Sequence, residues 1–103
     1  MLFHGIKINE PAADLGIALT VASSYKNIAI EKGVVAIGEV GLTGEIRAVN
    51  SIEKRIREAE KLGFQTCMIP ESSKKQLKYD GKLNIIGVRD IREALKACGL
   101  INT

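Results

Sequence analysis

The sequence predicts a mixed α+β domain in which a β-sheet packs against helices. Short apolar runs typical of strands alternate with segments whose apolar residues recur at helical spacing. Glycines at positions 41 and 44 separate two of the strand-like runs and predict one antiparallel hairpin. The hydrophobic content of 46% and charged content of 26% are ordinary for a globular chain. With 103 residues, the chain is expected to form one domain over 1–103.

The amino-terminal part predicts a strand followed by a helix. Residues 3–8 form a short strand whose abrupt start suggests a piece excised from a longer protein. Pro11 suits the first turn of the next helix, because its missing N–H would be unpaired there anyway. Up to Ala22 this helix is apolar nearly all round, so we expect it to be packed on more than one side.

The hairpin at residues 38–47 organises the middle of the chain. Residues 34–40 enter it as a nearly unbroken apolar run, which predicts a strand in the interior of the sheet. Residues 45–49 leave it as a second strand and lead into a helix whose N-cap residue is predicted to be Asn50 or Ser51. Asn50 and Glu53 fit a capping box, in which each side chain bonds to a backbone N–H at the helix start.

The helix after the hairpin is predicted to be amphipathic. Its buried stripe consists of Ile52, Ile56, Ala59 and Leu62. The charged residues between them usually form a solvated helix face. Gly63 is expected to end the helix.

The remaining elements follow the same alternation. They are a strand at 66–69 stopped by Pro70, a short helix capped by Ser72 or Ser73 and reaching residue 77, a strand at 83–88, and a last helix capped by Asp90.

The rare residue types argue against a metal site and a membrane location. Cys67 lies in an apolar run and is expected to be buried and inert, whereas the role of Cys98 stays open. His4 is the only histidine, so no metal-ligand cluster forms at a recognisable spacing.

No apolar run approaches the roughly 18 residues of a membrane helix, and no signal-peptide pattern is present. We expect a cytoplasmic domain without a cofactor.

The charge balance is compatible with nucleic-acid binding. A net charge of +3 and a pI near 9.0 permit phosphate contacts. Because only 4% of the residues are aromatic, duplex DNA is a better expectation than base stacking on a single strand. The candidate DNA-binding residues are Arg47, Arg55, Arg57, Lys74, Lys75 and Lys78.

Four motifs resemble the proteolytic domain of the Lon family. They are I-N-E-P-A-A-D-L at 8–15, G-E-V-G-L-T-G-E-I-R at 38–47, E-A-E-K-L-G-F at 58–64 and M-I-P at 68–70. Within that group, the chain is most similar to the C-terminal domain of the RadA (Sms) family of bacterial DNA-repair and recombination ATPases. The chain has no Walker phosphate loop of its own.

The resemblance implies that both catalytic groups of a Lon protease are absent. The position of the family's catalytic serine falls on Ala12, and that of its lysine on Glu53. A methyl group cannot attack a carbonyl, and a carboxylate cannot replace an amine of lowered pKa. The resemblance therefore implies a pseudo-protease domain that is not an enzyme. A rearranged dyad of Ser51 and Lys54 in an active Lon-type peptidase is the alternative.

The resemblance also implies partners. Lon-like domains form rings, so the resemblance implies a homo-oligomer, a hexamer in the full protein, that serves as a scaffold and a duplex-DNA-binding surface. ATP and zinc are expected only in the missing parts of the parent ATPase. An oligomerisation module without any ligand is a further possibility.

Overall fold

The structure is a computed structural model that describes residues 10–102. Its sheet is parallel and has the strand order β1-β4-β5, and a separate antiparallel pair, β2 and β3, forms the hairpin. This arrangement confirms the mixed fold of strands and packed helices. The predicted strand at 3–8 lies outside the described residues. The strands are β1 (Val34–Ala36), β2 (Glu39–Val40), β3 (Ile46–Arg47), β4 (Thr66–Pro70) and β5 (Asn84–Val88).

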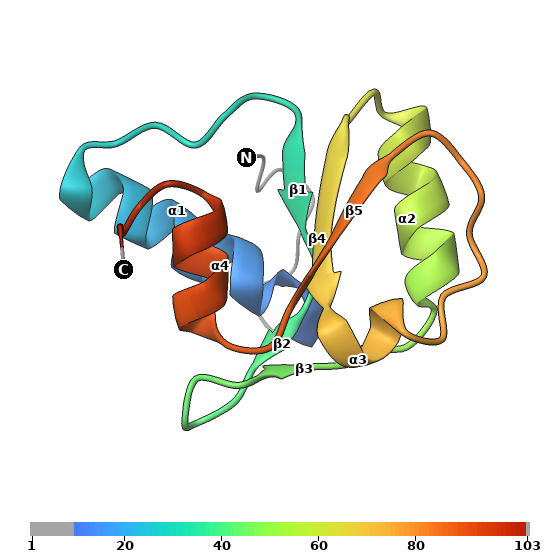
Figure 1. Ribbon diagram of the computed structural model, residues 1–103, viewed down its shortest axis with the longest axis horizontal. Coiled ribbons are helices and arrows are strands. Elements are labelled where there is room, and N and C mark those ends of the chain that lie inside the picture. The colour runs from blue at the N-terminus through green and yellow to red at the C-terminus, as the bar shows by residue number, and fades with distance from the viewer. Residues whose placement is uncertain (1–9, 103) are drawn as a thin grey trace.

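Helices cover both faces of the sheet (Figure 1). The helices α1 and α4 lie on one side of it, and α2 lies on the other. The short α3 follows β4 directly and packs against β5. The helical elements are η1 (Pro11–Ala13), α1 (Asp14–Lys26), α2 (Ile52–Lys61), α3 (Glu71–Lys74) and α4 (Ile91–Ala97).

Strand β4 is the central strand and is buried on both faces. Met68, only 1% exposed, points into a core formed with α1 and α4. Its neighbours Cys67 and Ile69, both fully buried, point into a second core under α2. Side chains of a strand alternate between its two faces, so one apolar run fills both cores.

The predicted interior strand at residues 34–40 is wrong in two respects. The run divides into β1 and β2, because the chain leaves the sheet at Gly38, whose N–H donates to Ala12 O at 3.0 Å. A Cβ at Gly38 would lie 2.8 Å from Ile46 Cγ2, so a glycine fits best at this bend. Among the described strands, β1 is also at the edge of the sheet, and the interior position belongs to β4.

Helix α1 packs on one side rather than on several. Leu15 and Leu19 are fully buried, whereas Val21 is 62% exposed and Tyr25 is 90% exposed. The expectation that this helix is packed on more than one side is therefore wrong for the described part of the chain. The apolar composition of α1 predicted a helix, but it did not predict which residues of the helix face the sheet.

The start of α2 differs from the predicted capping box. Ser51 is the N-cap residue with a φ of 59°, and no side chain bonds to the free N–H groups of the first turn. Asn50 instead accepts a hydrogen bond from Arg55 Nε through its carbonyl oxygen, at 3.0 Å. At the other end, Gly63 follows the helix with a φ of 93°, as expected, but Leu62 is 75% exposed and does not belong to the buried stripe.

The carboxyl-terminal elements follow the prediction more closely. Asp90 caps α4 by accepting a hydrogen bond from Glu93 N at 2.8 Å, which confirms the predicted cap. Helix α3 begins after Pro70 and ends at Lys74, so it is shorter than predicted, and neither Ser72 nor Ser73 is its N-cap residue.

The hairpin is a fixed arm rather than a loose loop. Gly41 N donates to Glu45 O at 2.8 Å, and Gly44 N donates to Gly41 O at 3.0 Å. The Glu45 carboxylate accepts from Thr43 and from Arg47, with an Arg47 NH2 distance of 2.8 Å. These hydrogen bonds lower the pKa of Glu45 to about 2.

Backbone hydrogen bonds also join the hairpin to the rest of the domain. Ile46 N donates to Arg89 O at 2.9 Å, and Ile91 N donates to Gly44 O at 2.8 Å. The segment after β5 therefore holds the base of the hairpin in place.

The contrast within α1 predicts the cost of truncating its side chains. Leu15→Ala removes a fully buried side chain and is expected to lower the free energy of unfolding by about 2 to 5 kcal/mol. Val21→Ala, in the same helix but mostly exposed, is expected to change it by no more than about 0.5 kcal/mol. Urea unfolding followed by circular dichroism measures both. Equal losses would contradict the one-sided packing of α1.

The lowered pKa of Glu45 predicts a pH-dependent contribution to stability. A carboxyl whose folded pKa lies below its ordinary value of 4.5 stabilises the fold above that value, and the contribution disappears as the pH falls towards about 2. Glu45→Gln is therefore expected to be less stable than the original chain at pH 7 and equally stable near pH 2. Urea unfolding at several pH values tests this. The exposed Glu31→Gln serves as the control, and a pH-independent loss in Glu45→Gln would contradict the prediction.

Candidate functional site

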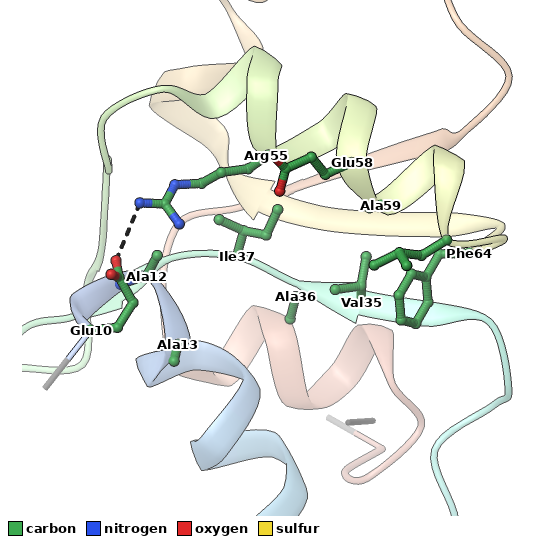
Figure 2. Close-up of a pocket in the computed structure, with 11 residues that line it drawn as sticks. Glu10, Ala12, Ala13, Val35, Ala36, Ile37, Arg55, Glu58, Ala59 and Phe64 are labelled. Carbon is green, nitrogen blue, oxygen red and sulfur yellow. Dashed lines mark hydrogen bonds and ion pairs between the residues drawn. The ribbon is translucent and has the colours of Figure 1, made fainter. Parts of the chain in front are cut away.

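A depression with a mainly apolar lining lies between α2 and β1, and we call it the α2–β1 groove (Figure 2). Its volume is about 240 Å³. Charged side chains lie towards one end, and apolar side chains form the rest. The lining residues are Glu10, Ala12, Ala13, Val35, Ala36, Ile37, Arg55, Glu58, Ala59, Leu62 and Phe64.

Arg55 forms the charged end of this groove together with Glu10. An Arg55 NH2 nitrogen lies 3.2 Å from Glu10 Oε1, across 45 positions of sequence. The side chains of Arg55 and Glu10 are 31% and 38% exposed, so water screens the ion pair and its net stabilisation is small. Its main consequence is positional, because it joins the start of α2 to the segment before η1.

The Arg55 and Glu10 pair also lines a second cleft. Ala12 lines both the groove and this cleft, so the two depressions meet at that residue. The floor and rim of the cleft include Glu39 from β2 and Asn50 from the approach to α2. The cleft residues are Glu10, Pro11, Ala12, Glu39, Ala48, Val49, Asn50 and Arg55.

The two positions assigned to a lost catalytic dyad lie at the starts of their helical elements. Ala12 is in η1 and only 6% exposed. Glu53 is half-buried in the first turn of α2. Ser51 and Lys54 are both exposed, and no hydrogen bond joins them within residues 10–102. Their proposed catalytic roles stay a hypothesis.

The three candidate DNA-binding arginines do not form one patch of free charge. Arg47 is paired with Glu45 at 2.8 Å, and Arg55 is paired with Glu10. Arg57 is exposed on α2, beside a shallow depression that Tyr79 also lines.

The three candidate lysines differ from Arg47 and Arg55 in having no ion-pair partner among the described residues. Lys74, Lys75 and Lys78 are exposed and close together in sequence, at the end of α3 and in the loop after it. In the described structure none of them forms an ion pair or a side-chain hydrogen bond. Their charge, like that of Arg57, is therefore uncompensated by a direct partner in the described structure.

Two site features were missed in the sequence. Glu10, which directly precedes Pro11, forms the ion pair with Arg55. The carboxylate of Asp14, in the first turn of α1, accepts a hydrogen bond from Val40 N at 3.2 Å. No local pattern indicates either contact, because both partners are more than 20 positions away.

The two cysteines lie in different environments. Cys67 is fully buried in β4, and burial raises the pKa of its thiol to about 12. Cys98 is half-buried, and burial also raises its pKa. Both are free thiols, and the prediction that Cys67 is buried is confirmed.

Neither a metal-ligand cluster nor a membrane-spanning helix occurs within residues 10–102. Histidine, cysteine, aspartate and glutamate residues do not gather there into a group able to hold a metal ion. No helix in that range has the length and apolar character to cross a membrane.

The fold and its depressions define a mixed α/β domain with an apolar groove ending in a charged pair. The family model described as subunit ChlI of Mg-chelatase matches residues 4–73, which is more than half of the chain. The chain therefore belongs to this ChlI family.

Curated relatives carry a different name. The chain is 47% identical over 92 residues to the DNA repair protein RadA of Streptococcus pneumoniae, covering 89% of this chain and 22% of that protein. For the protein of the same name from Listeria monocytogenes the identity is 47%, with 89% and 20% covered. For that of Bacillus subtilis it is 42%, with the same coverage of 89% and 20%. The chain thus spans about a fifth of the length of these relatives.

These comparisons correct one expectation. The sequence was interpreted as a pseudo-protease domain that is not an enzyme. The match to the ChlI family of Mg-chelatase subunits and the relatives named DNA repair protein RadA do not support that interpretation. The interpretation failed because it inferred the absence of activity from two substituted positions, Ala12 and Glu53.

The cysteine environments predict selective thiol chemistry. In the folded chain, a thiol reagent such as DTNB is expected to react with Cys98 and to leave Cys67 unmodified, because Cys67 is fully buried and its pKa is raised to about 12. Both thiols should react in denaturant. Absorbance of the released thiolate measures the reaction, and Cys98→Ala and Cys67→Ala assign it. Fast reaction of folded Cys98→Ala would contradict the prediction.

Proposed function

We propose that this chain is the C-terminal, Lon-proteolytic-domain-like part of a RadA-type DNA repair protein, in which it serves as a self-assembly scaffold and a duplex-DNA-binding surface. The 47% identity across 89% of the chain supports the connection to DNA repair proteins. ATP and zinc are assigned by this proposal to other parts of a cytoplasmic parent protein.

The free lysines of the segment 74–78 are the observation that carries the DNA-binding part. A phosphate competes poorly for a cation that is already paired with a carboxylate, as Arg47 and Arg55 are. Lys74, Lys75 and Lys78 have no such partner in the described structure and lie in an exposed segment. Lysine–phosphate contacts release counterions, so the affinity is expected to fall with salt and to depend little on sequence.

Exposed apolar side chains support the scaffold part. Leu42 and Leu62 are 102% and 75% exposed, and they belong to different elements. An assembled state that covers them gains stability from their removal from water. In the parent protein, this proposal places six copies in a ring. Sedimentation velocity at rising chain concentration tests whether the chain self-associates.

The DNA-binding part predicts a lysine-specific loss of affinity. The triple variant Lys74→Ala/Lys75→Ala/Lys78→Ala is expected to bind duplex DNA more weakly. The slope of log affinity against log salt should decrease by about 1 for each phosphate that a lysine no longer neutralises. Fluorescence anisotropy with a labelled duplex at several salt concentrations measures both quantities.

A control with the same change in net charge separates a site from general attraction. The exposed lysines Lys26, Lys32 and Lys96 lie elsewhere on the chain, and their triple alanine variant should keep most of the affinity. Equal losses in both triple variants would show nonspecific attraction to a basic chain. No binding by the original chain at low salt would remove the DNA-binding part and leave the scaffold part intact.

A further inference from the structure

We propose that Tyr79 is the positioning residue of the DNA-binding lysines. Its hydroxyl holds the segment 75–83 against α2, so that Lys78 and Lys82 are presented to the phosphates of duplex DNA in a fixed arrangement. Lys82, which is not among the candidates from sequence, thereby joins this surface. This inference rests on the proposed DNA-binding function and names the residue that gives the binding surface its shape.

The segment 75–83 joins α3 to β5 and contains neither helix nor strand. Lys75, Lys78 and Lys82 are exposed along it. In the described structure, no backbone–backbone hydrogen bond joins residues 78–82 to the rest of the chain. Side-chain contacts therefore set the position of this stretch and of the lysines that it carries.

The Tyr79 hydroxyl supplies two such contacts. It donates a hydrogen bond to Glu60 Oε1 in α2, and it accepts one from Leu83 N at 2.9 Å, just before β5. The backbone lies close against this pair of oxygens, because a Cβ at Gly81 would overlap both Glu60 Oε1 and Tyr79 Oη. One hydroxyl group thus connects the turn, α2 and the approach to β5.

The ring of Tyr79 adds an apolar contact. Both Tyr79 and Leu77 pack against the core under α2, and the exposed Lys78 lies between them in sequence. Burial of the Tyr79 side chain and its bond to Glu60 raise the pKa of the hydroxyl, which therefore keeps its proton at neutral pH and remains a donor. Lys78 is thus carried by a backbone that is held at both of its neighbours.

This attachment brings the segment beside further free cations. In Figure 1 the segment runs alongside α2 on its way from α3 to β5. Arg57 and Lys61 of α2 line the same depression as Tyr79, and neither forms an ion pair in the described part of the chain. Glu60 and Asp80 also line it, and the Glu60 carboxylate is bonded to Tyr79. Cations from two elements therefore meet at one surface.

A lysine on a fixed backbone should bind a phosphate more tightly than one on a mobile backbone. Ordering a mobile side chain on binding lowers affinity by about two- to tenfold. The slope of log affinity against log salt depends instead on how many phosphates are neutralised. Loss of a positioning residue should therefore weaken binding at every salt concentration without changing this slope.

Fluorescence anisotropy with a labelled duplex at several salt concentrations tests this difference. Tyr79→Phe keeps the ring but removes both hydrogen bonds, and it is expected to bind about two- to tenfold more weakly with an unchanged slope. Lys82→Ala is expected to lower the slope by about 1. Tyr25→Phe makes the same chemical change at a tyrosine that is 90% exposed, and it should bind like the original chain. Circular dichroism melts check that each variant folds.

A pair of double variants separates positioning from charge repulsion, because Tyr79→Phe also leaves the Glu60 carboxylate without its donor. Tyr79→Phe/Glu60→Gln removes that charge. Tyr79→Phe/Glu58→Gln has the same net charge but changes an exposed carboxylate elsewhere on α2. The two double variants are expected to bind equally. Recovery of affinity only in the variant with Glu60→Gln would overturn the positioning role.

Amide hydrogen exchange examines the attachment without any substitution. In the original chain the N–H of Leu83 is expected to exchange slowly, because it is bonded to the Tyr79 hydroxyl. Tyr79→Phe should speed this exchange and leave that of the fully buried Cys67 in β4 unchanged. Fast exchange of the Leu83 N–H in the original chain would overturn the attachment, whether or not Tyr79→Phe folds.

The binding results distinguish this inference from the function on which it rests. No binding by the original chain at low salt would overturn the DNA-binding proposal and this inference together. Binding that the triple lysine variant weakens and Tyr79→Phe leaves unchanged would overturn this inference and leave the DNA-binding proposal standing. A lower salt slope in Tyr79→Phe would overturn the positioning role in favour of a direct phosphate contact, and an unchanged slope in Lys82→Ala would remove Lys82 from the surface.

Discussion

The fold depends on the burial of β4 on both of its faces. Cys67 and Ile69 point towards α2, while Met68 points towards α1 and α4. A strand with two buried faces requires helices on both sides, and it also requires backbone partners at both edges, which β1 and β5 provide. The three-layer arrangement follows from that requirement, and so does the position of α2, whose outer edge forms the groove.

The hairpin lies outside the three-stranded parallel sheet. It leaves the sheet at Gly38, returns through β3 and is held at its base by the segment that follows β5. The domain thus combines a buried framework with one anchored projection. This division explains how an exposed residue such as Leu42 can be rigid, because its position is set by backbone hydrogen bonds and not by packing of its own side chain.

Local patterns predicted the alternation of strands and helices, the Asp90 cap and the burial of Cys67, because each depends on neighbours in sequence. They failed for the strand at residues 34–40, whose apolar composition gave no sign that the backbone turns out of the sheet at Gly38. They also failed for Leu62, which has the spacing of the buried stripe but lies beyond the edge of the core. Spacing defines the face of a helix, whereas burial depends on how far the opposing layer extends.

The sequence by itself determined the mixed class of the fold, the turn of the hairpin and the overall basic charge. The tertiary structure alone decided which charges are free, since Arg55 meets Glu10 across 45 positions while the lysines of 74–78 meet no carboxylate in the described structure. It also decided where the apolar groove opens. Both properties depend on distances between segments remote in sequence, and these distances are set only when the layers pack around β4.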